Sequence, residues 1–168
     1  MTHLTRVPDL NAQRAAMKKL GFLIGKWNGE ARLARGPGEW LDFASEVQYK
    51  LDGLILVIEG VGRTNSDGHS VLQAFAVISF DDETASYRIR AFNNGYFIES
   101  DVKLLNQDKG IRWGFTLGQI TTKSVLRINE SGEWTELAEI KIGSEPPKNC
   151  WNLPSTKLTR SYRNCYGN

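Results

Sequence analysis

Apolar and polar residues alternate with a period of two along most of the chain, and this period is typical of half-buried β-strands. In residues 41–50, most odd positions are apolar or aromatic and most even positions are polar or charged. Other strand-like runs occupy residues 25–30, 54–63, 71–80, 87–92, 96–105, 110–117, 119–129, 133–142 and 156–163. The pattern therefore predicts an all-β protein.

Short turn-forming sequences separate these runs. Residues 93–95 (Asn-Asn-Gly) are a strong hairpin signal, because Asn and Gly tolerate the positive φ angles of tight hairpin turns. Residues 36–38 (Gly-Pro-Gly) and 51–53 (Leu-Asp-Gly) are also turn sequences. About ten strands joined in this way predict an antiparallel up-and-down sheet. We expect a closed β-barrel, because closure removes the sheet edges, and a barrel of this width has room for an internal cavity.

One helix is expected before the first strand. Apolar residues recur at helical spacing from Leu10 to Leu20, Asp9 is a candidate N-cap, and Gly21 ends the pattern. An amphipathic helix of this length cannot bury its apolar stripe alone, so we expect it to cap one end of the barrel. The whole chain, 1–168, is then one domain, with the tail and helix in 1–24 and the barrel in 25–163.

Composition narrows the function classes. The net charge is only +2, with both signs interspersed, so the chain lacks the basic field that binds nucleic acid. We find neither a signal-peptide pattern nor an apolar run long enough to cross a bilayer, and we expect a cytoplasmic protein that does not bind membranes. In that compartment Cys150 and Cys165 are expected to be free thiols, with a bond between them as the alternative.

Glu59 is the acidic residue that the pattern singles out. It interrupts an apolar run and shares one face of its strand with Ile55, Val57 and Val61. If that face points inward, the carboxylate must be paired or have a raised pKa, and it lines a pocket. If the face points outward, Glu59 is a structural or rim charge, and both interpretations stay open.

Four aromatic residues are candidates for the wall of a cavity. Tyr49, Tyr87, Tyr96 and Trp113 each fall on the apolar face of their own strand. The same placement suits ordinary core packing, and alternation alone does not distinguish the two roles. Together with Glu59, they are the candidate ligand-binding residues. The two His and two Cys have no metal-site spacing, so we expect no metal.

Three short motifs resemble the calycin superfamily: residues 25–30 (Gly-Lys-Trp-Asn-Gly-Glu), 51–53 (Leu-Asp-Gly) and 158–160 (Leu-Thr-Arg). Within it the chain is most similar to bacterial lipocalin-like domains of unknown function, related to nitrobindin and the fatty-acid-binding proteins. The resemblance implies that Trp27 packs against Arg160 and latches the barrel. Nitrobindin-like proteins hold haem through a late histidine, whereas this chain has only His3 and His69. We therefore expect no haem and no other cofactor.

These observations favour a binding protein, as a monomer or homodimer. We expect it to hold a small apolar or amphipathic molecule in the barrel lumen without catalysis. The alternative is a cyclase or isomerase that acts on a hydrophobic substrate, with Glu59 as the acid or base. A third hypothesis, an interaction module that uses the outside of the barrel, requires a large exposed apolar patch.

Overall fold

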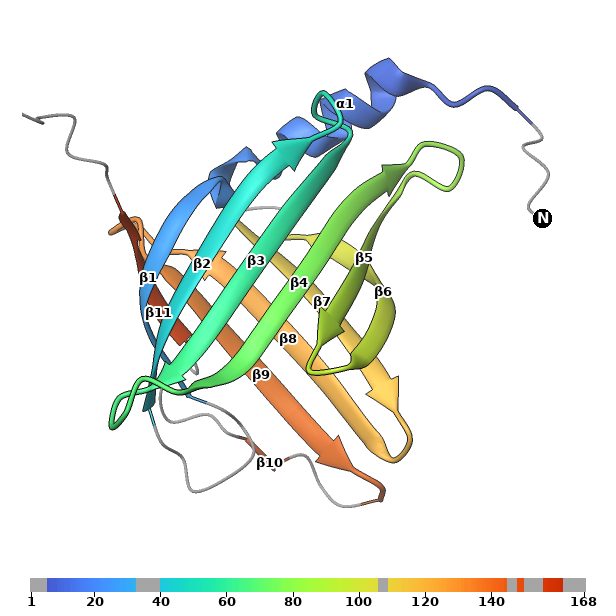
Figure 1. Ribbon diagram of the computed structural model, residues 1–168. Coiled ribbons are helices and arrows are strands. Elements are labelled where there is room, and N and C mark those ends of the chain that lie inside the picture. The colour runs from blue at the N-terminus through green and yellow to red at the C-terminus, as the bar shows by residue number, and fades with distance from the viewer. Residues whose placement is uncertain (1–5, 33–39, 106–108, 145–147, 150–155, 162–168) are drawn as a thin grey trace, which may run out of the picture.

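The computed structural model describes residues 6–32, 40–105, 109–144, 148–149 and 156–161 (Figure 1). Its elements in chain order are α1 (Leu10–Lys18), the 3₁₀ turn η1 (Gly21–Leu23), β1 (Gly25–Arg32), β2 (Trp40–Lys50), β3 (Ile55–Thr64), β4 (Ser70–Asp81), β5 (Ser86–Asn93), β6 (Tyr96–Leu104), β7 (Lys109–Leu117), β8 (Ile120–Ile128), β9 (Trp134–Ile142), β10 (Lys148–Asn149) and β11 (Thr156–Ser161).

The strands form one antiparallel sheet in which β1 to β9 follow one another up and down. The sheet curls, so that β2 to β4 lie in front of β7 to β9 in Figure 1. At its end β9 pairs with both β8 and β11, and β11 pairs in turn with β1. The all-β, up-and-down prediction is therefore confirmed.

The seam between β6 and β7 is different from the other hairpins. Its ladder contains only two residue pairs, Lys103 with Arg112 and Leu104 with Ile111, whereas β7 and β8 pair along their full lengths. Beyond these pairs, Ser100 Oγ donates a hydrogen bond to the Gly114 carbonyl across the seam. The structure therefore shows a curled half-barrel, and closure of the barrel stays a prediction.

Two tight turns have the backbone that their sequences predict. Asn94 and Gly95 have φ angles of 47° and 85°, as the β5–β6 hairpin requires. Leu51 and Asp52 also have positive φ, at 50° and 56°. The predicted turn at residues 36–38 lies outside the described residues, as do Cys150 and Cys165.

The inner face of the sheet is filled at one end. Cross-strand pairing places alternate residues on this face, and Trp27 on β1 is an inner residue with no exposed surface. The buried core combines such residues with the apolar side of the helix: Ala16, Met17, Leu20, Leu23, Trp27, Val47, Leu56, Ile78, Tyr87, Ile89, Val102, Ile111, Leu126 and Trp134. These residues gather at the end of the sheet that α1 covers.

The helix α1 lies across that end, as predicted (Figure 1). Asp9 is its N-cap, because one carboxylate oxygen accepts hydrogen bonds from the backbone N–H groups of Asn11 and Ala12. At the other end of the helix, the hydroxyl groups of Tyr49 and Tyr87 donate to the carbonyls of Met17 and Ala16, each at 2.8 Å. The two tyrosines therefore tie β2 and β5 to the last turn of α1.

Asp82, in the β4–β5 turn, anchors the segment around the start of α1. Its carboxylate accepts from the Arg6 guanidinium, the Asp9 backbone N–H and the Gln13 amide. These groups cover the side chain, which is only 8% exposed although it lies at the periphery of the molecule. The same hydrogen bonds, led by that from Gln13, lower the pKa of Asp82 to about 2.

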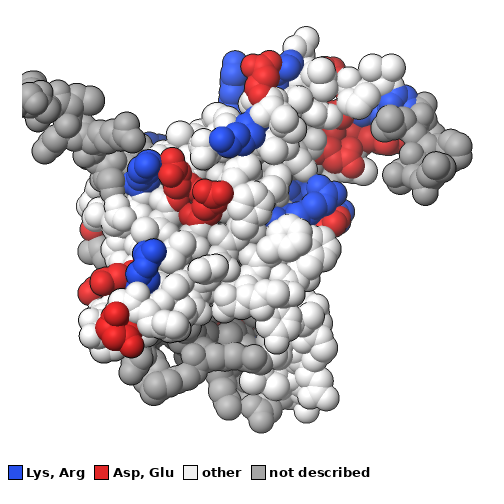
Figure 2. Space-filling view, in the orientation of Figure 1, with Lys and Arg blue, Asp and Glu red and all other residues white. Residues whose placement is uncertain are grey.

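The outer face is less polar than clean alternation implies. Phe75, Phe92 and Phe97 are cross-strand neighbours on β4, β5 and β6, and they are 38%, 51% and 53% exposed. The rings of Phe92 and Phe97 lie 5.2 Å apart between centroids. Figure 2 shows this side of the molecule, where large uncharged areas separate scattered charged groups.

Trp27 connects β1 to β9 through side-chain packing. Its indole Nε1 donates to the Leu23 carbonyl at 2.9 Å, and its ring meets the edge of Trp134 with centroids 5.5 Å apart. Arg160 pairs with Trp27 in the β1–β11 ladder, but its side chain lies outside the described part of the structure. The contact of Trp27 with that guanidinium stays a prediction.

Replacing Trp27 by Ala should lower the free energy of unfolding by about 3–5 kcal/mol, because the change leaves a cavity beside Trp134. Chemical denaturation followed by circular dichroism measures this loss. Trp40, which lies at a strand end rather than in the buried core, provides a Trp→Ala control with a smaller expected loss. An unchanged midpoint for Trp27→Ala would contradict the packing described here.

Replacing Asp82 by Asn should lower the thermal midpoint, because the anchor of the helix loses its charge. The pKa of Asp82 is lower in the folded state, so its contribution is present above about pH 4 and disappears as the pH falls towards 2. Thermal unfolding from acid to neutral pH should show wild type and variant converging in acid. The control is Glu83→Gln in the same exposed turn, and a gap independent of pH would refute the assignment.

Candidate functional site

The five residues proposed from the sequence do not gather at one place. Tyr49 and Tyr87 are inner residues beneath α1, where burial raises the pKa of both hydroxyls. Tyr96 is exposed at the first position of β6. Trp113 is partly buried at an inner position of β7 and packs against the core. Tyr49 and Tyr87 thus lie on the inner face next to α1, and Trp113 lies on the same face further from the helix.

Glu59 lies on the outer face of β3. Its cross-strand neighbours are Glu46 on β2 and Phe75 on β4, and its side chain is exposed. The inner positions of this strand are occupied instead by residues such as Leu56 and Ile58. The condition for a role in the lumen, an inward-facing side chain, is therefore not met for Glu59.

Away from α1, the inner face carries small side chains among larger ones such as Phe43 and Phe115. Ala76 on β4 pairs with Ala91 on β5, and Ser124 on β8 pairs with Ala138 on β9. The three alanines are only partly buried. Because these side chains point inward, their remaining accessible surface faces the interior of the curled sheet. The inner face is therefore filled beneath the helix and accessible beyond it.

Glu136 is the acidic residue that the fold places on this inner face. It sits on β9 between Trp134 and Ala138, and it pairs with Leu126 on β8. Apart from Lys109, which is exposed at the start of β7, it is the one Asp, Glu, Lys or Arg at an inner position of β1 to β9 within the described residues.

Burial of Glu136 disfavours the ionised form of its carboxyl group. Removal of the carboxyl from water raises its pKa to about 7, and the nearby Trp134 indole offsets part of this rise. Part of the residue surface nevertheless remains accessible.

Two buried polar atoms on the same wall lack hydrogen-bond partners of ordinary geometry among the described residues. They are Nε1 of Trp134 and Oγ1 of Thr122, on β9 and β8. The Trp134 N–H is close enough to influence the Glu136 carboxyl, but it falls short of a full hydrogen bond. Buried polar atoms without partners are costly, so a molecule that binds against these strands could form hydrogen bonds with them.

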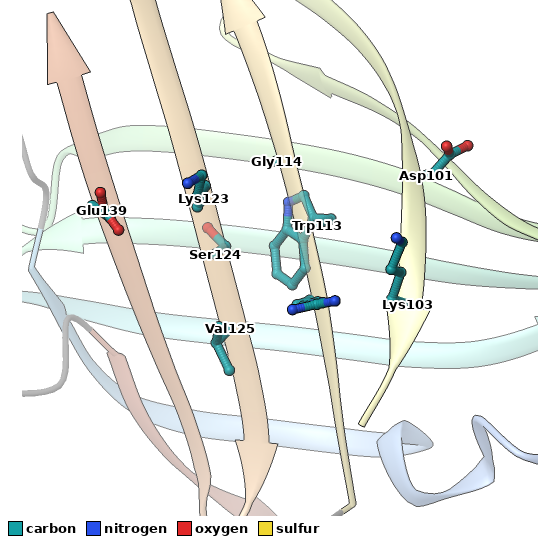
Figure 3. Close-up of a pocket in the computed structure, with 9 residues that line it drawn as sticks. Asp101, Lys103, Trp113, Gly114, Lys123, Ser124, Val125 and Glu139 are labelled. Carbon is teal, nitrogen blue, oxygen red and sulfur yellow. The ribbon is translucent and has the colours of Figure 1, made fainter. Parts of the chain in front are cut away.

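A groove lies where β6 and β7 separate. It has a volume of about 410 Å³, and Figure 3 shows its side chains along β6 to β9. The lining residues are Asp101, Lys103, Arg112, Trp113, Gly114, Lys123, Ser124, Val125 and Glu139. Most of these occupy outer positions, but Trp113 and Ser124 belong to the inner face. The groove therefore lies mainly on the charged outer surface, and two residues of the inner face also border it.

The described residues contain no cluster of three or more His, Cys, Asp or Glu side chains that could hold a metal ion. They also contain no helix that is both long and apolar enough to cross a membrane. Comparison of the sequence with models of known protein families and with curated proteins finds no match in either set. The site is therefore interpreted from its own geometry.

The alternation in β9 contains a signal that identifies Glu136. Trp134, Ala138 and Ile140 share its face, whereas the opposite face carries Thr135, Glu139 and Lys141 among its residues. Only one face of β9 is predominantly apolar, so Glu136 is a clearer candidate than Glu59 for an inward-facing acid.

Replacing Glu136 by Gln should stabilise the protein at alkaline pH and leave it nearly unchanged in acid. The raised pKa means that stability is lost as the pH rises from about 4.5 to 7, and the full penalty, roughly 3 kcal/mol, is present above that range. Urea denaturation at several pH values measures the difference. Glu139→Gln, on the outer face of the same strand, is the control and should show no gain in stability that grows with pH. A pH profile like that of the wild type for Glu136→Gln would be inconsistent with a buried carboxyl.

Proposed function

We propose that this protein binds a small, mainly apolar molecule inside its curled sheet and does not transform it. The observation that carries the proposal is the division of the inner face. Large side chains fill the end beneath α1, whereas Ala76, Ala91 and Ala138 beyond it keep accessible surface. Apolar interior surface that remains accessible is the usual lining of a small-molecule site.

The arrangement of the strands supports the same proposal. Pairing of β9 with β8 and β11, and of β11 with β1, fits a barrel of ten strands made from β1 to β9 and β11. A barrel of this size is wider than one filled by its own side chains. The likeness to lipocalin-like calycins, which rests on the motifs around Trp27 and Arg160, agrees with this proposal.

The groove between β6 and β7 is our candidate for the entrance. Trp113 and Ser124, at inner positions, border it, and the two strands share only two residue pairs there. An opening of this kind needs no unfolding of the core beneath α1, because the core lies at the filled end.

Replacing Ala91 by Phe tests the proposal. An additional ring at an inner position should occupy the binding space and weaken ligand binding at least about tenfold, while stability changes little. Nile red fluorescence and native mass spectrometry with fatty alcohols measure binding, and urea denaturation measures stability. In a fully packed interior, the same ring would instead cost about 1–3 kcal/mol.

Ala44→Phe is the matched control, because Ala44 lies at an outer position of β2 between Asn28 and Val61. It should leave binding unchanged. Equal binding by both variants, or no bound probe with the wild-type protein, would overturn the proposal.

A second candidate function is acid–base catalysis on the bound molecule, such as isomerisation or cyclisation. The observation that favours it is Glu136, an interior carboxyl whose pKa of about 7 suits proton transfer near neutral pH. The catalytic role first assigned to Glu59 passes to this residue because Glu59 is on the outer face. Deuterium exchange next to the carbonyl of a lipophilic ketone, lost in Glu136→Gln, would support it.

A further inference from the structure

We propose that the groove at the seam between β6 and β7 binds a small organic anion, whose carboxylate or phosphate group contacts Lys103 and Arg112. This site lies on the outer surface and is separate from the interior site of the proposed function. An anion held there bridges β6 and β7, which share only two residue pairs.

The cations of the groove are the first part of the argument. Lys103 on β6, Arg112 on β7 and Lys123 on β8 line it, and all three are exposed at outer positions. In Figure 3, Lys103 and Lys123 lie on opposite sides of Trp113. Within the described part of the chain, none of the three cationic side chains forms an ion pair. Cations gathered in one groove without acidic partners favour the binding of an anion.

The two acidic residues of the groove offset only part of this charge. Asp101 lies 3.3 Å from Arg88 on β5, in a network of two arginines and two acidic residues that is neutral by itself. Glu139 lies opposite Lys123 in the β8–β9 ladder. Counting the three cations against Glu139 alone leaves an excess of two positive charges in the groove.

The placement of Lys103 and Arg112 is the second part of the argument. They are direct cross-strand neighbours, in one of the two residue pairs that join β6 to β7. Like charges placed opposite each other weaken the pairing of two strands. The planar guanidinium of an Arg can hold two oxygens of a carboxylate or phosphate at once. An anion between the two side chains therefore replaces a repulsion with two attractive contacts and stabilises the seam.

The groove has room for more than an inorganic ion. Its volume of about 410 Å³ lies in the range of small-molecule sites. Trp113 and Val125 also border it, and both are only partly buried. Gly110 and Gly114 flank Arg112 on the outer face of β7, so no neighbouring side chain of that strand covers its guanidinium. These features favour an organic anion with an apolar or aromatic part beside its charged group.

Isothermal titration calorimetry with phenyl phosphate, benzoate and benzyl alcohol tests the inference. The first two probes carry the two candidate charged groups, and the third carries the same ring without a charge. The wild-type protein should bind the better of the two anions at least about tenfold more tightly than benzyl alcohol. Inorganic phosphate and acetate, which lack the ring, should bind more weakly than their ring-bearing counterparts. Raising NaCl from about 0.02 M to about 0.3 M should weaken anion binding at least about threefold, because salt screens exposed charges.

Replacing Arg112 by Gln should weaken binding of the preferred anion at least about tenfold, because the bidentate contact is lost. Arg63→Gln is the matched control, since Arg63 is an exposed outer residue of β3 that does not line the groove. It should leave the affinity unchanged. Ala91→Phe, at an inner position, should also leave it unchanged, so that failure of this site and failure of the interior site are distinguishable.

Replacing Lys103 by Gln provides a second readout, the thermal midpoint. In a chloride buffer without oxyanions, the variant should be at least as stable as the wild type, because a repulsive pair is gone. Saturation with the preferred anion should raise the midpoint of the wild type more than that of the variant.

Three outcomes would overturn the inference and leave the proposed function standing. They are equal anion affinity in the wild type and Arg112→Gln, binding of benzyl alcohol as tight as that of both anions, and binding of the ring-free ions as tight as that of their ring-bearing counterparts.

Discussion

The contact between Trp27 and Trp134 is the constraint on which the rest of the structure depends. It joins β1 to β9, two strands separated by most of the chain, and both indole rings are buried. The bond from Trp27 to the Leu23 carbonyl adds the segment after α1 to the same cluster. Aromatic pairs contribute both buried area and a preferred geometry, so this cluster fixes the curvature of the sheet and the position of its helical cover together.

Because this cluster stabilises one end of the curled sheet, the opposite end can be less tightly packed. Stability comes from large side chains beneath α1, such as Leu20, Leu56 and Ile78, all without exposed surface. Beyond them, small residues such as Ala76, Ala91 and Ala138 occupy some of the inner positions. The seam between β6 and β7 is held by two residue pairs and the Ser100 hydroxyl. The molecule thus separates a packed, stabilising region from a more accessible one, where we propose that the ligand binds.

Local patterns in the sequence predict the elements well but predict the site poorly. The Asp9 cap, the hairpin at Asn94 and Gly95 and the strand periods depend on neighbouring residues alone, and the structure has them. The side on which Glu59 lies depends on which face of β3 is inner. Both faces of that strand are apolar, with Val57 on one and Leu56 on the other, so alternation does not identify it.

The alternation of apolar and polar residues identifies Glu136 as an inner residue, but it does not predict the opening between β6 and β7. In β9 the polar residues Glu139 and Lys141 mark the outer face, which leaves Glu136 inside. The separation of β6 from β7 is a property of the curled sheet as a whole, and neither strand carries a local signal for it. The exposed phenylalanines 75, 92 and 97 likewise meet only through cross-strand pairing.

The most direct test of an accessible, ligand-binding interior is NMR of protein with labelled alanine methyl groups during titration with decan-1-ol. We predict saturable shifts at Ala76, Ala91 and Ala138 on the inner face, with Ala16 beneath the helix and Ala44 on the outer face unaffected. Shifts confined to Ala44, or none at the three inner alanines, would contradict the account.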